Sequence, residues 1–271
     1  MTALEDYITK YENIACERRN GVLQVTLHTR GGPWVFSEQS HHDLPLFFAD
    51  IAADPDNKVV ILTGTGDRFC TSFDVATFLK ILIANPAEGR LRIRSDGVRL
   101  LTALADIEVP VIAAINGPAL VHAEIPVLAD VVLATDTTVL QDAMHFAMGS
   151  VPGDGVHIIW TRLLGPNRGR YFLMTGQKLS AREALDLGVV GELLLADRWL
   201  ERAWELAEKW AKLPRATLVS TRQAINYEWK RLLREQLQAG LTEQGLAAAL
   251  GIQPSGDPSN IPPLELMPAE S

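Results

Sequence analysis

The chain has 271 residues, of which 47% are hydrophobic and 21% are charged, a composition typical of folded globular proteins and not of disordered ones. Its 25 basic and 33 acidic residues give a formal net charge of −8, without the clustered positive charge that nucleic acid binding requires. Two cysteines, Cys16 and Cys70, are too few for a disulfide framework. No signal peptide is visible, and polar residues interrupt the most apolar stretch, 109–133. These features predict a soluble, reduced, cytoplasmic protein with neither nucleic acid nor membrane as a partner.

Strands and helices are predicted to alternate along the first half of the chain. Alternating apolar and polar residues predict a half-buried strand over 21–29. Continuous apolar runs predict buried strands at 59–63, 110–115 and 130–135. Apolar residues at helical spacing predict helices over 37–53 and 90–107. This alternation is typical of an α/β core.

The second half of the chain is predicted to be mainly helical. The predicted helices are 155–164, 168–175, 181–187 and 197–213. A last helical region is expected over 216–250, punctuated by Gly240 and Gly245. Residues 252–271 hold five prolines and little to bury, so we expect a mobile tail. The predicted fold class is therefore α/β with a helical C-terminal extension.

Two histidines and an aspartate are candidates for chemistry. His122 follows the buried strand at 110–115, His145 follows an apolar segment, and Asp154 lies in a Pro-Gly-Asp-Gly turn that opens a helix. Loops after buried parallel strands are where α/β proteins place functional side chains, and imidazole acts as an acid or a base near neutral pH. A second interpretation fits the same residues: the histidines are satisfied core residues, and Asp154 caps the helix.

The remaining motifs indicate less. His41 and His42 fall in the first predicted helix, where one of them can face inward, and His28, His157 and Cys70 fit structural positions. The chain has no Gly-x-Ser-x-Gly elbow, no complete dinucleotide or P-loop motif, and no ligand spacing typical of zinc. From its residues alone, the sequence indicates an α/β enzyme with acid–base histidines.

Several motifs together resemble the crotonase, or enoyl-CoA hydratase/isomerase, superfamily over residues 13–250. The motifs are Val-Val-Ile-Leu-Thr-Gly at 59–64, Phe-Cys-Thr-Ser-Phe-Asp at 69–74, Pro-Val-Ile-Ala-Ala-Ile-Asn-Gly at 110–117, the turn at 152–155, and Thr-Gly at 175–176 followed by 181–190. The resemblance implies a crotonase-like ββα spiral core at 1–195, a helical trimerisation region at 196–252 and a mobile tail at 253–271. It also implies a homo-oligomer, either a trimer or a dimer of trimers.

Departures from the superfamily pattern indicate a subgroup. Where enzymes acting on CoA thioesters have a glycine-rich run, this chain reads Val-His-Ala at 121–123, and the two hydratase glutamates would fall near Ile125 and His145. Enoyl-CoA hydration therefore has little support. Instead, the chain resembles 6-oxocamphor hydrolase and related β-diketone hydrolases. The residues that carry this resemblance are His41, His122, Glu124-Ile125-Pro126, His145, the turn at Asp154, and 165–172.

The subgroup resemblance implies a reaction and its residues. The reaction is retro-Claisen hydrolysis of a carbon–carbon bond in a cyclic or bicyclic β-diketone to a keto acid, with no cofactor, CoA or metal. His145 would deprotonate the attacking water, His122 would donate a hydrogen bond to a carbonyl, and Asp154 would hold the water or orient an imidazole. The substrate-binding residues implied are His41, Phe36, Phe73 and Gln244.

Two of these positions differ from the subgroup. Phe36 stands where the subgroup has a tryptophan that donates to a carbonyl, and Gln244 stands where it has a glutamate that partners the catalytic histidine. The neighbouring Glu243 is rotated by about 100° on a helix, so we expect it to face elsewhere. Because glutamine cannot stabilise an imidazolium by charge, either the His145 base is weaker here or Asp154 supplies the acidic partner.

Three other functions fit parts of the sequence. The nearest is an enoyl-CoA hydratase or isomerase that acts on a CoA thioester. A serine or zinc hydrolase is more distant. A crotonase without activity that serves as a binding or assembly subunit is the non-enzyme alternative, and it would bind no dione.

Overall fold

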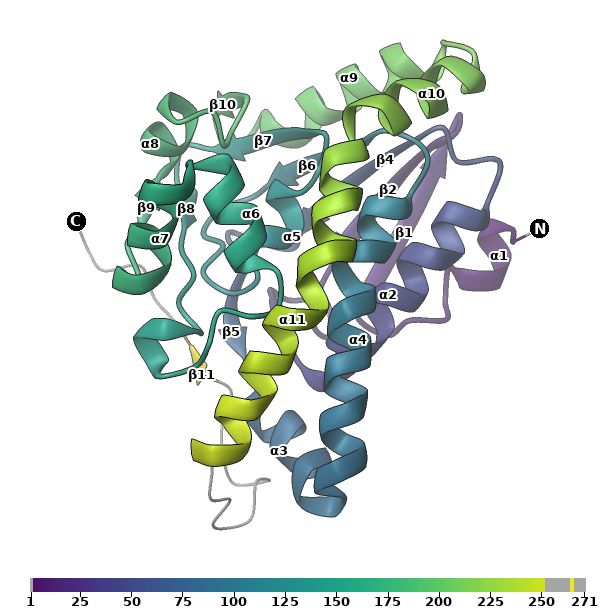
Figure 1. The fold of residues 1–271 in the computed structure, drawn as a ribbon. Coiled ribbons are helices and arrows are strands. Elements are labelled where there is room, and N and C mark those ends of the chain that lie inside the picture. Colours follow the sequence, from purple (N-terminus) through teal and green to yellow (C-terminus); the bar gives the residue numbers. More distant parts are fainter. Residues whose placement is uncertain (1, 252–263, 266–271) are drawn as a thin grey trace.

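The computed structural model describes residues 2–251 and 264–265, which build a mixed α/β fold around a central sheet (Figure 1). The sheet has six strands in the order β1-β2-β4-β6-β7-β10. β1 and β2 pair antiparallel, and the other neighbours pair parallel. The strands are β1 (Ile14–Arg19), β2 (Val22–Leu27), β4 (Val59–Gly64), β6 (Val111–Ile115), β7 (Val131–Thr135) and β10 (Glu192–Leu194).

Two smaller sheets and the helices surround the central sheet. One small sheet contains β11 (Leu264–Glu265), β5 (Cys70–Phe73) and β3 (Trp34–Phe36), and the other pairs β8 (Val139–Leu140) with β9 (Leu179–Ser180). The helices of the first half are α1 (Leu4–Tyr7), α2 (Glu38–Ala53), α3 (Val75–Ala84), α4 (Pro86–Asp106) and α5 (Glu124–Val127). The later helices are η1 (Phe146–Met148), α6 (Val156–Leu163), α7 (Pro166–Thr175), α8 (Ala181–Asp186), α9 (Trp199–Ala211), α10 (Arg215–Ile225) and α11 (Tyr227–Gly251).

The central sheet is buried on both faces, which explains the continuous apolar runs of its inner strands. β4 and β6 are buried along their whole lengths. Val59 and Ile61 point to the face covered by α9, where they join a cluster with Ala203 and Ala207. The alternate strand residues belong to the larger core, which includes residues of α2 and α4. The sheet is therefore a rigid base for the loops that follow its strands.

The structure confirms each predicted strand and most predicted helices to within a few residues. The region predicted as helical over 216–250 is divided differently, because α10 and α11 meet at Asn226, whereas Gly240 and Gly245 lie inside α11. Asn226 is buried and donates a hydrogen bond to the carbonyl of Ala105 at the end of α4. The break therefore occurs at a polar anchor and not at a glycine. β1 and α3 were not among the predicted elements, and the predicted tail at 253–271 lies outside the described residues apart from β11.

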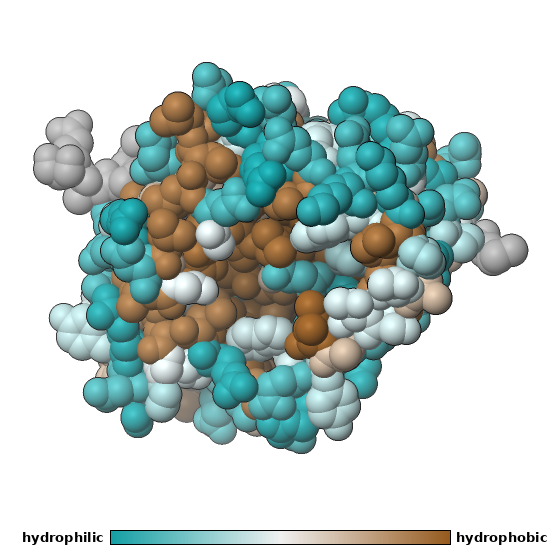
Figure 2. Space-filling model, turned by 90° about the horizontal axis from the view of Figure 1, so that it is seen from above, coloured by the Kyte–Doolittle hydropathy of each residue, from teal (hydrophilic) through white to brown (hydrophobic). Residues whose placement is uncertain are grey.

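The surface carries a hydrophobic area. Figure 2, which looks down on the top of Figure 1, shows hydrophobic residues gathered around a hollow in the middle of this face. Leu195 after β10, Leu213 after α9 and Ile225 at the end of α10 are among the exposed large hydrophobic residues. Apolar surfaces of this kind often mark contacts between protein chains, and the homo-oligomer remains a prediction. Within the described ranges, no helix combines the length and apolar character needed to cross a bilayer.

Candidate active site

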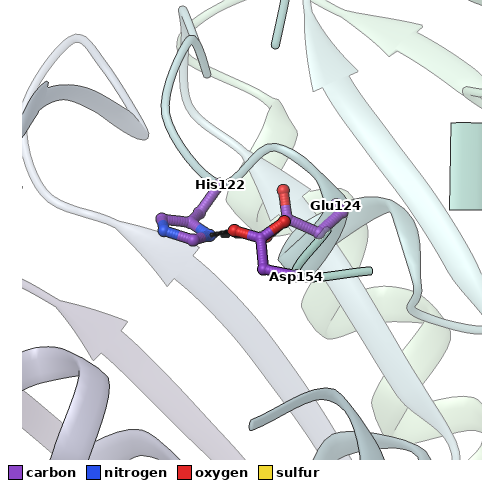
Figure 3. Close-up of side chains that lie close together, drawn as sticks. All are labelled: His122, Glu124 and Asp154. Carbon is purple, nitrogen blue, oxygen red and sulfur yellow. Dashed lines mark hydrogen bonds and ion pairs between the residues drawn. The ribbon is translucent and has the colours of Figure 1, made fainter. Parts of the chain in front are cut away.

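His122 and Glu124 form a hydrogen-bonded pair in the turn between β6 and α5. Nδ1 of His122 lies 2.6 Å from Oε1 of Glu124 (Figure 3). The turn is held because the N–H groups of Leu120 and Val121 both donate to the carbonyl of Cys70. His122 itself has a φ of 50°, a left-handed conformation that is strained for a residue with a Cβ atom. Strain of this kind concentrates at functional sites, because the surrounding structure must enforce it.

His145 lies between two carboxylates. Its Nδ1 atom is 2.6 Å from Oδ1 of Asp142, and its Nε2 atom is 3.1 Å from Oδ2 of Asp154. The same Asp154 oxygen lies 3.9 Å from Nδ1 of His122. The structure thus brings together His122, His145 and Asp154, the predicted catalytic residues, with Asp154 between the two imidazoles.

Asp154 does not cap the helix that follows it. The N-cap residue of α6 is Gly155, which has a φ of 116°, and no side chain bonds to the helix start. A Cβ atom at Gly155 would lie 2.2 Å from Cδ1 of Leu101, so this turn requires glycine. The interpretation of Asp154 as a helix cap is therefore wrong, because the turn directs its carboxylate to His145.

The charges around His145 set its protonation. Burial lowers the pKa of His145, but the charge of Asp154 and the hydrogen bonds to Asp142 and Asp154 outweigh burial and hold the pKa well above its usual value. Burial raises the pKa of Asp154, but the charge of His145 outweighs burial and holds that pKa below its usual value. At neutral pH, His145 is therefore an imidazolium that donates both N–H groups to carboxylates.

His122 is paired at one ring nitrogen. Burial lowers the pKa of His122, but the charge and hydrogen bond of Glu124 outweigh burial, so the pKa is raised. Burial raises the pKa of Glu124, and His122 offsets this only in part. Among the described residues none is hydrogen-bonded to Nε2 of His122, and Figure 3 shows this nitrogen pointing away from both carboxylates. His122 can therefore offer Nε2 to a reactant.

Aromatic side chains form a wall beside His122. The ring centroid of Phe36 lies 3.8 Å from that of His122. The rings of Phe73 and Phe78 are nearly parallel, 5.2 Å apart, and both also stack with Phe36. His41 packs edge-on against Phe36 and Phe78, and burial, followed by the charge of His122, lowers the pKa of His41 to about 4. A wall of phenylalanines and a neutral imidazole suits an uncharged, apolar ligand.

α11 borders the turn that carries Asp154. A Cβ atom at Gly153 would lie 2.9 Å from Cβ of Gln244, so Gln244 lies against this turn. Oε1 of Gln244 is buried and has no hydrogen bond within the described part of the chain. Glu243 is exposed, which confirms the prediction that it faces elsewhere.

The architecture around this site matches a known family. Residues 17–247, most of the chain, match the profile of the enoyl-CoA hydratase/isomerase family. The chain belongs to the enoyl-CoA hydratase/isomerase family. This membership confirms the resemblance indicated by the sequence motifs, and the family's fold agrees with the α/β core and the helical C-terminal part.

Individual members of the enoyl-CoA hydratase/isomerase family differ in their likeness to this chain. A β-diketone hydrolase from the cyanobacterium Anabaena sp. PCC 7120, solved with bound (S)-3-oxocyclohexyl acetic acid, is 45% identical, with 90% of this chain and 96% of that chain covered and a TM-score of 0.86. An enoyl-CoA hydratase/isomerase from Mycobacterium paratuberculosis is 23% identical over 87% and 93% of the two chains with a TM-score of 0.80, a likeness of fold alone. Carnitinyl-CoA dehydratase from Proteus mirabilis is 31% identical over 198 residues, which are 70% of this chain and 71% of the relative.

The sequence analysis missed three residues of the candidate site in this chain. Glu124 and Asp142 were not predicted as histidine partners, although they lie two residues after His122 and three residues before His145. That proximity was the available signal, and only the backbone conformation decides whether such neighbours meet. Phe78 was missed because its helix, α3, was not predicted.

The same cluster holds side-chain atoms of the kind that bind a metal ion. His122, Glu124 and Asp154 offer nitrogen and oxygen atoms that all lie within 4.8 Å of one another. Nδ1 of His122 is already hydrogen-bonded to Glu124, so an ion would have to displace that proton before both atoms could coordinate it. In the structure, His122 pairs with Glu124, and His145 pairs with Asp142 and Asp154.

Proposed function

We propose that this family member hydrolyses a carbon–carbon bond of a cyclic or bicyclic β-diketone and releases a keto acid. The observation that carries the proposal is the pair of buried imidazoles, His122 and His145, each with its own carboxylate and with Asp154 between them. The likeness to the Anabaena enzyme supports it. The keto acid bound to that enzyme is the product expected when water cleaves bicyclo[2.2.2]octane-2,6-dione.

Hydrogen bonding favours His122 as the general base. The family resemblance implies His145 in this role, but both ring nitrogens of His145 already face carboxylates. When His122 is neutral, its Nδ1–H donates a hydrogen bond to Glu124, and its Nε2 can take a proton from water. The Glu124 carboxylate then stabilises the imidazolium that forms. Phe36 packs on the face of the His122 ring and so helps to fix its orientation.

Asp154 and His145 are assigned to orienting the water. Oδ1 of Asp154 is buried and has no hydrogen bond to another described residue, so it can accept one from the attacking water. The imidazolium of His145 holds the other Asp154 oxygen and keeps the carboxylate ionised. Asp142 in turn fixes the ring of His145.

Bond cleavage follows from addition of this water. Hydroxide adds to one carbonyl carbon, and the bond from that carbon to the carbon between the two carbonyls breaks. The electron pair moves into the second carbonyl as an enolate, whose oxygen the neutral imidazole of His41 can stabilise by donating a hydrogen bond. The proton taken by His122 returns to the enolate carbon, so the base is regenerated and the product is a keto acid.

The activity is tested by following the loss of diketone ultraviolet absorbance with bicyclo[2.2.2]octane-2,6-dione, beside a crotonyl-CoA control. We expect keto acid formation and no reaction with crotonyl-CoA. The reverse pattern would overturn the proposal and assign the chain to CoA thioester chemistry, as in carnitinyl-CoA dehydratase.

Variants test the assigned residues. We expect His122→Gln to lose about 100-fold or more in kcat, the scale of one general base. Asp154→Asn and His145→Ala should each lose at least about tenfold, or about 1.4 kcal/mol of transition-state stabilisation. His28→Gln is the matched control, because His28 lies at a strand end and its Nδ1 accepts a hydrogen bond from the nearby Gly31 N–H. Wild-type rates in the His122 variant would remove it from the base role.

A further inference from the structure

The turn that carries Asp154 rests on the backbone of α11. A Cβ atom at Gly153 would lie 2.2 Å from the carbonyl oxygen of Gly240. In the opposite direction, a Cβ atom at Gly240 would lie 2.4 Å from the carbonyl oxygen of Gly153. Non-bonded Cβ atoms do not approach other atoms so closely. The contact therefore requires glycine on both sides, and it lies one residue before Asp154.

His157 fills the remaining space at the same contact. A Cβ atom at Gly240 would also lie 2.3 Å from Cε1 and 2.7 Å from Nε2 of the His157 ring. Nδ1 of His157 is buried and has no hydrogen bond within the described ranges. Burial lowers the pKa of His157, although the charge of Asp154 acts in the opposite direction. The neutral imidazole is therefore packed between α6 and α11, close enough to Asp154 for the charge of that carboxylate to affect its pKa.

The glycine in α11 has an energetic cost that its position explains. In a helix interior, glycine is less favourable than alanine by about 1 kcal/mol. α11 carries this cost at Gly240, where any side chain would push away both His157 and the Asp154 turn. Gln244, one turn further along α11, contacts the same turn at Gly153. The C-terminal helix thus meets the candidate site through its backbone at Gly240 and through the Gln244 side chain.

We propose that Gly240 of α11 and His157 of α6 are positioning residues that set the place of the Asp154 carboxylate against His145. The inference rests on the proposed function only in giving Asp154 a part in the reaction. Asp154 lies next to Gly153 in the chain and is 3.1 Å from Nε2 of His145, so a displacement of the Gly153 carbonyl alters this contact. The titratable groups that interact with His145 are Asp142, Asp154, His122 and His157. Asp142 and His122 lie outside the contact with α11 and should stay in place.

The experiment compares Gly240→Ala with Gly245→Ala in the full chain. Both substitutions add one methyl group to α11, but a Cβ atom at Gly245 would meet nothing within 4 Å. The first readout is the pKa of His145 from NMR of histidine-labelled protein, which needs no substrate. The second is kcat and KM with the bicyclic dione. Thermal unfolding of each variant separates local displacement from general loss of stability.

We expect Gly240→Ala to lower the pKa of His145 and to reduce kcat/KM by at least tenfold, while Gly245→Ala leaves both at wild-type values. The double variant Gly240→Ala/His157→Ala removes the clash with the imidazole but keeps the clash with the Gly153 carbonyl oxygen, so the pKa of His145 should stay lowered in it. It also supplies the test if Gly240→Ala alone does not fold. An unchanged pKa of His145 in the folded Gly240 variants would overturn the inference. An enzyme inactive on diones whose His145 pKa still shifts would overturn only the proposed function.

Discussion

The occupied and unoccupied ring nitrogens of His122 and His145 decide which chemistry each imidazole can perform. His145 uses both nitrogens on carboxylates, whereas His122 uses only Nδ1. The sequence could single out these histidines and Asp154 as candidates, but it could not show that they meet, because His122 follows β6 of the central sheet whereas His145 follows β8 of a separate small sheet. It could not predict their partners, since the pairing of His122 with Glu124 depends on a left-handed backbone conformation at residue 122 that a histidine rarely adopts.

This pairing predicts a pH dependence at the residue scale. A general base acts only when it is unprotonated, and Glu124 holds the pKa of His122 above the usual value of 6.5. We therefore expect the acidic limb of kcat/KM for the dione to lie above pH 6.5. In Glu124→Gln the negative charge is lost, so the limb should move to lower pH and kcat on the plateau should fall. Glu243→Gln, an exposed change of the same type on α11, is the control, and a limb that stays in place in Glu124→Gln would contradict the assignment.

At the scale of elements, the sequence predicted those strands and helices whose positions depend on the local pattern of apolar residues. Apolar runs located the inner strands because parallel strands are buried on both faces. The junction of α10 and α11 was not predictable in this way, because it depends on distant contacts. Asn226 and Arg222 both donate to carbonyls at the C-terminal end of α4, more than 100 residues earlier in the chain.

The contacts of Arg222 predict how much the attachment of α10 to α4 and Asp130 contributes to stability. Its guanidinium is 2% exposed, binds Asp130 at 2.6 Å and donates to the carbonyls of Ala105 and Ile107. Arg222→Met would leave the Asp130 carboxylate buried without its cation, which costs about 3–5 kcal/mol of unfolding free energy. Arg198→Met, which removes an exposed pair with Glu201, should change stability by only about 0.5 kcal/mol. Urea unfolding measures both, and equal losses would show that the buried pair does not anchor α10.

At the scale of the whole molecule, titration of buried histidines should shape the pH range of stability. His145 has a raised pKa, so its stabilising contribution is complete below pH 6.5 and is lost as pH rises through its folded pKa. His41 has the opposite shift, to about 4, so its neutral form stabilises the fold above pH 6.5 and this contribution is lost as pH falls towards 4. These two groups alone would place maximum stability near pH 6.5.

His41 allows the acid side of this profile to be tested. A shift from 6.5 to about 4 corresponds to at most about 3 kcal/mol of unfolding free energy lost between these pH values. His41→Phe keeps an aromatic ring beside Phe36 and Phe78 but removes the titrating group. We expect its melting temperature to fall less than that of the wild type between pH 6.5 and pH 4, by several degrees. His28→Phe should retain the wild-type acid slope, and a wild-type slope in His41→Phe would mean that other groups, not His41, govern acid unfolding.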